Sequence, residues 1–416
     1  MNRFNATAAT AVITIALALT ACSPPPLEGV TAYEGATIIP GDGSAPISAG
    51  VLVVDHGSIS AVGAAGQVEV PAGAARLDVT GKTIMPALID THTHVRQTPE
   101  ALTQDLKQRA YWGVGATLAL GTDSADVVAM RDPVMAGAAR FFSAGRGITA
   151  PEPGRTLSPP FSDPYNIDTP EAGVAAVNEQ AALNVDIIKI WVDDRNEQYD
   201  KLTPELYGPI IDAAHEKGLA VTAHIHDLSD AKGLLQAGID SFAHMVRDAV
   251  MDEESITLAI QNAGFVQIPN LTGRGVPTDI SWLQGVLPDD EFAGIVKGNT
   301  VNESAQALFN MQAESLSMLK DAGVTITMGT DGNRAWGAHV EMEDMVATGM
   351  TPMEVIVSST GDAAAFIGAD DTGILTSGKS ADFLILDGNP LDDITNTRRI
   401  SSVFLRGEEV DRTVYP

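Results

Sequence analysis

Eight short apolar runs, separated by helix-like stretches along residues 84–370, constrain the fold of this chain more than any other feature. Stretches such as 203–218 and 351–368 have the Thr-Pro opening and the closing Gly that are typical of helices. The runs are 87–94, 115–122, 139–145, 185–193, 218–227, 238–245, 264–271 and 324–331. Eight alternations predict an α/β protein with a (β/α)8 TIM barrel, whose functional residues lie at the carboxyl ends of the strands. An open doubly wound sheet is the alternative, and the lack of a glycine-rich phosphate-binding motif disfavours it.

The two ends of the chain have a different pattern, in which β-branched residues alternate with Gly, Asp and Ser turns. This pattern covers residues 30–83 at the start and residues 371–416 at the end. We expect these two segments to pair into one small β-sandwich beside a barrel formed by residues 84–370.

Several central strands end in His or Asp, although a barrel strand is covered on both faces and should be apolar. His92 and His94 end the first run, and because alternate residues of a strand share a face, their imidazoles project side by side. The later strand ends carry His224, His226, His244 and Asp331. Imidazole and carboxylate groups that converge at one mouth are suited to Zn²⁺ or a similar divalent ion. The alternative is that each histidine is a core residue hydrogen-bonded to backbone.

Lys189 interrupts the apolar run at 185–193, where burial of an unpaired ammonium group is costly. Reaction of its amine with CO₂ would give N6-carboxylated lysine, an anionic ligand that can bridge two metal ions. This interpretation predicts a site with two divalent metal ions. The alternative is a lysine near the strand end whose side chain extends into solvent.

An ordered series of motifs resembles the amidohydrolase superfamily of metal-dependent hydrolases, and within it the imidazolonepropionase-like and prolidase-like enzymes. The motifs are "DTHTH", "IKI", "TAHIH", "DSFAH", "GTD", the helix that starts "TPMEVIVSS" and the tail "TGILTSGKSADFLILDGNP". The metal ligands that the resemblance implies are His92, His94, Lys189, His224, His244 and Asp331. The first two and Asp331 would hold the more buried ion, His224 and His244 the outer one, and carboxylated Lys189 would bridge them.

The resemblance implies hydrolysis of an amide, in a small peptide such as an Xaa-Pro dipeptide or in an N-acyl amino acid, by a metal-bridging hydroxide. Single-metal deaminases of the superfamily lack the bridging lysine and have Glu after the strand-five histidine, where this chain has "HIHD". Asp331 is expected to take the proton of the attacking water and pass it to the departing nitrogen. His226 is expected to stabilise the carbonyl oxygen or hold substrate, or alternatively to support a metal ligand.

Arginines in the expected loops at the mouth would suit a substrate that carries a carboxylate. Arg247, three residues after His244, is the best candidate, and His339 and Trp336 are expected to line the pocket. A lactone or cyclic-amide hydrolase with the same metals is the alternative. A non-catalytic binding lipoprotein on the same barrel is a third interpretation.

The charge of the chain limits its partners. It has 54 acidic residues against 25 Lys and Arg, which gives a formal net charge of −29. Nucleic acid is therefore a poor partner, because its phosphates would be repelled.

The first 21 residues have the pattern of an export signal, with Arg3 followed by uncharged residues from Ala6 to Ala21. This stretch is too short to span a bilayer as a helix. "LTAC" at 19–22 resembles the lipobox of bacterial lipoproteins, so Cys22 is expected to carry a lipid and residues 22–29 to form a tether. Ser23 resembles the signal for the outer membrane, which implies an anchor there that faces the periplasm. An ordinary cleavage site is the alternative.

Overall fold

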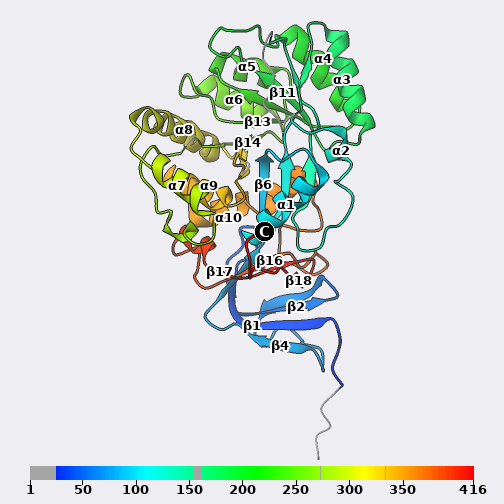
Figure 1. Ribbon diagram of the computed structural model, residues 1–416, viewed down its shortest axis with the longest axis vertical. Helices are drawn as coiled ribbons and strands as arrows, with labels where there is room; N and C mark the ends of the chain where they lie inside the picture. Colours follow the sequence, from blue (N-terminus) through cyan, green and yellow to red (C-terminus); the bar gives the residue numbers. More distant parts are fainter. Residues whose placement is uncertain (1–24, 153–161, 272, 333) are drawn as a thin grey trace, which may run out of the picture.

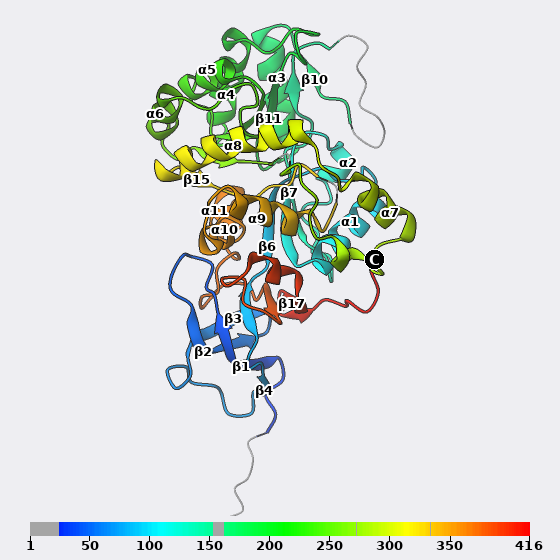
Figure 2. The same cartoon turned by 90° about the vertical axis from the view of Figure 1, so that its left-hand side faces the viewer.

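A computed structural model of the chain describes residues 25–152, 162–271, 273–332 and 334–416. The expected signal segment and Cys22 lie outside the described residues. The parallel strands and their helices lie at one end of the molecule and a second sheet at the other (Figures 1 and 2).

All eight strands expected between residues 84 and 370 are present and parallel. They are β6 (Leu88–Thr93), β7 (Val114–Ala119), β8 (Arg140–Ser143), β11 (Ile188–Val192), β12 (Val221–Ile225), β13 (Ser241–Ala243), β14 (Val266–Ile268) and β15 (Thr325–Ile326). Two short strands that were not expected, β9 (Ile148–Thr149) and β10 (Tyr165–Asn166), extend the edge of β11. The apolar runs form these strands because both of their faces are covered.

The parallel strands form two sheets, of three strands (β6–β8) and of seven strands (β9–β15). Backbone hydrogen bonds join these sheets at both junctions. At one, the amide of Asp186 donates to the carbonyl of Ser143 over 2.9 Å; at the other, the amide of Thr91 donates to the carbonyl of Met328 over 3.0 Å. The protein therefore has the α/β fold that was expected, and closure into a single barrel stays a prediction.

Helices connect the strands in chain order. They are α1 (Pro99–Tyr111), α2 (Ala125–Val128), α3 (Pro170–Ala182), α4 (Pro204–His215), α5 (Leu228–Gln236), α6 (Glu253–Gln261), α7 (Asp289–Gly298), α8 (Glu303–Asp321), α9 (Gly337–Ala347), α10 (Pro352–Ser358) and α11 (Gly361–Ile367). Four of them begin with a Thr-Pro pair, in which proline suits the first helical position. The apolar faces cover the strands: Ile190 of β11 shares a buried cluster with Val177 of α3 and Ile210 of α4.

The single helix expected over 351–368 is wrong, because the segment forms α10 and α11 with a break between them. At the break, the hydroxyl of Ser359 donates to the carbonyl of Val355 over 2.9 Å, and that of Thr360 donates to the carbonyl of Ile356 over 2.6 Å. Such side-chain bonds compete with the helical pattern. The backbone of Thr360, with φ of −137° and ψ of −88°, leaves the helical region.

The ends of the chain pair with each other, as expected. The eight strands of this second sheet are β1 (Val30–Ile38), β2 (Ile47–Asp55), β3 (Ser58–Ala64), β4 (Ala75–Asp78), β5 (Thr83–Pro86), β16 (Phe383–Leu386), β17 (Ile400–Leu405) and β18 (Glu408–Glu409). The two ends meet where β5 pairs antiparallel with β16, with Ile84 opposite Ile385. The strands form one sheet, and the β-sandwich stays a prediction.

Among the described residues, no helix is both long enough and apolar enough to cross a membrane.

Candidate metal centre

Three side chains meet at one point, two from the end of the first of the eight expected strands and one from the loop after the last. His92 lies near the end of β6 and His94 just after it, and Asp331 follows β15. The Oδ1 atom of Asp331 is 2.9 Å from Nε2 of His94 and 3.2 Å from Nε2 of His92. Each residue offers one ligand atom, and the three atoms lie within 4.8 Å of one another. This spacing suits shared coordination of one ion.

His224, in β12, and His244, just after β13, continue this group. Nε2 of His244 is 3.6 Å from Oδ2 of Asp331, and the ring centroids of His244 and His92 are 5.2 Å apart. The ring of His224 follows, with its centroid 4.6 Å from that of His244. We call these five residues, His92, His94, His224, His244 and Asp331, the strand-end cluster. The structure therefore brings together these five residues from the ends of four strands, β6, β12, β13 and β15.

Lys189 lies in β11 with only 1% of its surface exposed. Its Nζ atom has no hydrogen-bond partner among the described residues. Burial lowers the pKa of Lys189 to about 7, with the negative charge of Asp331 opposing that shift and the charges of Arg247 and Arg195 adding to it. Space for the side chain depends on Gly121, since a Cβ atom there would lie 2.7 Å from Cγ of Lys189. Lys189 is thus buried, loses its proton more readily than an exposed lysine, and interacts electrostatically with Asp331 of the strand-end cluster.

The second nitrogens of His92 and His94 are held by polar side chains. Nδ1 of His92 is 2.8 Å from Oδ1 of Asn270, and Nδ1 of His94 is 3.2 Å from Oγ1 of Thr122. Because the amide oxygen of Asn270 only accepts, Nδ1 of His92 donates to it and Nε2 keeps a free lone pair for a metal. The sequence reasoning missed Asn270, although it lies near the end of the run at 264–271, just as the predicted ligands lie near the ends of theirs.

Burial also keeps the imidazoles of His92 and His244 neutral. It lowers the pKa of His92 and of His244 well below the usual value, against the opposing charge of Asp331. Neutral imidazole is the form that binds a metal ion. For Asp331, burial alone would raise the pKa, but the neighbouring histidines hold it well below the usual range, so this carboxylate stays ionised.

Three residues of this region have left-handed backbones, which are uncommon for residues other than glycine. The φ angles are 121° for His244, 44° for Asn270 and 51° for Asp331. Strained backbone conformations persist only where the surrounding structure determines them, and they gather at functional sites. Their occurrence here supports the choice of this cluster as the candidate site.

An acidic residue that sequence reasoning missed contacts His224. Oδ2 of Asp193 is 3.0 Å from Nε2 of His224, and Asp193 also pairs with the guanidinium group of Arg195. Burial would raise the pKa of Asp193, but the hydrogen bonds from His224 and from the amide of Arg195 outweigh it and lower the pKa. Asp193 is therefore an ionised group beside the expected outer ligand.

The buried state of His224 gives a prediction on pH. Burial lowers the pKa of His224 to about 4, and its contact with Asp193 opposes the shift. The unfolded chain takes up this proton near pH 6.5, so the folded state loses relative stability as pH falls from about 6.5 to 4, by about 3 kcal/mol for this group. Urea unfolding of the metal-free protein should show a loss of stability that is smaller by this amount in His224→Gln than in wild type, because the other buried histidines, such as His92 and His244, contribute in both proteins.

The exposed His215, which pairs with Asp240 outside the cluster, provides the control, because His215→Gln should retain the contribution of His224. Equal pH dependence in wild type and His224→Gln would contradict the prediction.

The expected substrate-contacting residues lie in different places. Nη2 of Arg247 donates to Nδ1 of His244 over 2.9 Å, so this guanidinium group lies beside the cluster. Nδ1 of His226 is 2.7 Å from Oδ1 of Asp227, and its side chain is 35% exposed at the rim.

The structure does not bring His339 and Trp336 to the cluster. His339 is buried, with Nδ1 bonded to the hydroxyl of Thr397 and Nε2 to the carbonyl of Trp112. Trp336 is also buried, and its ring contacts that of Trp282. Both side chains pack into an aromatic group around α9, because that helix turns them away from Asp331.

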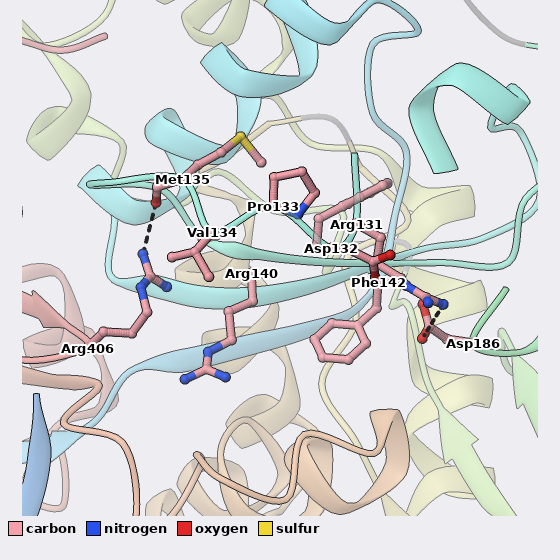
Figure 3. A pocket seen from close by; sticks show the side chains of 11 residues that line it. Arg131, Asp132, Pro133, Val134, Met135, Arg140, Phe142, Asp186 and Arg406 are labelled. Atoms are coloured by element: carbon pink, nitrogen blue, oxygen red, sulfur yellow. Dashed lines mark hydrogen bonds and ion pairs between the residues drawn. The ribbon is translucent and has the colours of Figure 1, made fainter. Parts of the chain in front are cut away.

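A cavity of about 360 Å³ lies elsewhere, between β8 and the turn at Arg406 (Figure 3). No residue of the strand-end cluster lines it. Its arginines are already engaged by protein groups: Arg131 pairs with Asp186, and Arg406 donates to the carbonyl of Met135. This cavity is therefore separate from the candidate metal centre.

Comparison with known proteins gives consistent results. The profile of the amidohydrolase family matches residues 83–410. Ochratoxinase of Aspergillus niger is 28% identical over 257 residues, which are 60% of this chain and 50% of that protein, so the chain spans about half the length of this relative. A putative prolidase from Bifidobacterium longum has a TM-score of 0.76 and 28% identity, with 94% of this chain and 96% of that one covered. A Xaa-Pro dipeptidase with bound methionine has a TM-score of 0.73 and 25% identity, with coverage of 91% and 99%.

Proposed function

Because this chain belongs to the amidohydrolase family, we propose that it is a metal-dependent hydrolase that cleaves the carbon–nitrogen bond of an amide. The observation that carries the proposal is the buried Nζ atom of Lys189, which has no hydrogen-bond partner in the described chain and interacts electrostatically with His92, His224 and Asp331. An uncharged amine is the form that reacts with CO₂, and burial favours that form of Lys189. The carbamate would supply the anionic charge that such a position needs beside two cations.

The donor set fits two divalent ions, most simply Zn²⁺. His92, His94 and Asp331 would hold the inner ion, and His224 and His244 the outer one, with carboxylated Lys189 between them. The neutral imidazoles, the fixed Nδ1 of His92 and the ionised Asp331 support this assignment. When bound, a metal pair lowers the pKa of water and polarises a carbonyl group.

Asp331 would act as the proton carrier. It is the only carboxylate in the strand-end cluster and is 36% exposed, which leaves it open to the mouth. As the oxygen of water bonds to the carbonyl carbon, Asp331 would take its proton; as the carbon–nitrogen bond breaks, the proton would pass to the leaving nitrogen. His226, at the rim, would contact substrate rather than metal.

The substrate would be a small amide with a carboxylate, such as an Xaa-Pro dipeptide or an N-acyl amino acid. The prolidase and dipeptidase names of the similar structures support this class. Arg247 supports it further, because its guanidinium group lies beside His244 and its buried Nε atom has no partner among the described residues. A carboxylate would complete the hydrogen bonding of this group.

Four further proposals come from the sequence. The eight parallel strands would close into one barrel, and the terminal segments 30–83 and 371–416 would form a β-sandwich beside it. Residues 1–21 would act as a signal peptide, and Cys22 would carry the lipid that anchors the protein in the outer membrane.

Metal analysis and a hydrolysis screen test the function. Purified protein should hold about two divalent ions per chain and hydrolyse members of a panel of dipeptides and N-acyl amino acids better than lactones. Chelation should remove activity, and Zn²⁺ should restore it. A variant with both His92 and His94 changed to Asn is the matched control, which should lose metal and activity together. Protein that hydrolyses the panel with one ion or none would contradict the binuclear site.

A further inference from the structure

The segment that carries Asp331 has an unusual backbone that its own sequence does not explain. Asp331 has a φ of 51° and lies between Thr330 and Gly332. The amides of Thr330 and Asp331 both donate to the carbonyl of His92, over 3.1 and 2.8 Å. The end of β6 and the loop after β15 are therefore joined at the point where their side chains meet.

A buried carboxylate holds one side of Asp331. Asp90, only 1% exposed, accepts from the amide of Thr330 over 3.0 Å through Oδ1 and from its hydroxyl over 2.8 Å through Oδ2. These two bonds fix both the backbone and the side chain of Thr330. Asp90 thus fixes the position of Thr330, the residue immediately before Asp331.

A buried guanidinium group holds the other side. Arg109, on α1 and also 1% exposed, places Nη1 3.4 Å from Oδ2 of Asp90. Its Nη2 atom donates to the carbonyl of Gly332 over 3.1 Å. One guanidinium group therefore connects Asp90 with the residue immediately after Asp331, from a helix that carries no residue of the strand-end cluster.

We propose that Asp90 and Arg109 are positioning residues, which hold Asp331 in its left-handed conformation so that its carboxylate meets Nε2 of His92 and His94. We call this arrangement the Asp90–Arg109 clamp. The inference rests on the proposed function for its consequence, which is affinity for the inner metal ion, while the positioning itself is a property of the metal-free chain. Aspartate adopts a left-handed backbone more readily than most residues but does not prefer it, and the clamp supplies contacts on both sides that hold it there.

A purely structural ion pair would give a different result. In that case its loss would lower the stability of the whole protein and leave the geometry of Asp331 unchanged. Removal of Asp90 itself would strand a buried guanidinium group, so milder changes give the clearer experiment.

Thr330→Val removes the hydroxyl group that Asp90 accepts from and keeps the shape of the side chain. Arg109→Lys keeps the charge but loses the planar group that reaches both Asp90 and Gly332. Thr330→Ser restores the hydroxyl group and is the rescue variant. Thr397→Val is the matched control, because Thr397 is a buried threonine whose hydroxyl also has two partners, at Ile394 and His339.

The first readout is Zn²⁺ affinity, measured by competition with a chromogenic chelator. We expect the tighter site to weaken about 10- to 100-fold in Thr330→Val and Arg109→Lys, the range typical for loss of a group that orients a metal ligand. Thr330→Ser and Thr397→Val should stay within about threefold of wild type. A loss of affinity in Thr397→Val equal to that in Thr330→Val would overturn the inference.

The second readout is the crystal structure of each variant without metal. Asp331 should leave the left-handed region, and its Oδ1 atom should move away from Nε2 of His94. If both variants keep Asp331 as it is in the wild type, the clamp is refuted. This readout is independent of the proposed function, which fails separately if wild-type protein binds no divalent ion.

Discussion

Replacement of Lys189 by Ala should abolish amide hydrolysis, with kcat/KM lower by about 10³-fold or more, as happens when a catalytic unit loses one of its members. The physical reason is that carboxylated Lys189 would supply an anionic oxygen ligand between the two ions, which alanine cannot replace. Without it, the charge of the two cations would be offset only by Asp331 and by Asp193, which lies beside His224. The measurement is steady-state hydrolysis of the best amide found in the screen.

Short carboxylic acids provide a second arm for this experiment. Lys189→Ala leaves room in β11 that formate or acetate can enter, and their carboxylates resemble a carbamate. Partial recovery of activity with added acid would support carboxylation of the lysine. Lys232→Ala is the control, since Lys232 is a surface residue paired with Asp252 and Glu254. Normal turnover by Lys189→Ala would rule out the bridging role.

Asp331→Asn should lower kcat by about 10²- to 10⁴-fold, which is the usual contribution of a proton-transfer group to the rate. Asn has nearly the same size and also tolerates a left-handed backbone, so the loop should keep its shape. The change removes the negative charge and the ability to take a proton. Since the histidines hold the pKa of Asp331 well below its usual range, the wild-type carboxylate is ionised at neutral pH and the loss applies there in full.

The control for this change is Asp362→Asn. Asp362 is a half-buried carboxylate in α11, away from the strand-end cluster. Its replacement should leave kcat as it is in wild type. An Asp331→Asn protein with wild-type kcat would show that another group carries the proton.

Much of the fold and of the candidate site followed from local patterns. The eight strands were predictable because each apolar run is long enough for one covered strand, and the histidines were noticeable because they break such runs. Their meeting followed from the rule that parallel strands present their carboxyl ends together. The structure confirms the strands and brings the strand-end residues together, while their roles as ligands stay predictions.

The contacts that support these residues could not be predicted in the same way. Asp90 contacts Thr330, and Asn270 contacts His92, although the partners in each pair lie far apart in the sequence and meet only in the folded chain. No local pattern marks Arg109 either, since an arginine on a helix normally faces solvent. His339 was misplaced for the opposite reason: nearness to Asp331 in the sequence suggested nearness in space, but α9 directs this side chain into the aromatic group.

The pairing of β5 with β16 has a consequence for how the molecule is assembled. Only Ala87 separates β5 from β6, the strand that bears His92 and leads directly to His94. One edge of β5 is occupied by residues 383–386, which follow every residue of the strand-end cluster in the sequence. In a nascent chain, β5 can therefore pair with β16 only after the whole cluster has been synthesised. The support that this pairing gives to the base of β6 would thus form later than the synthesis of the residues it helps to position.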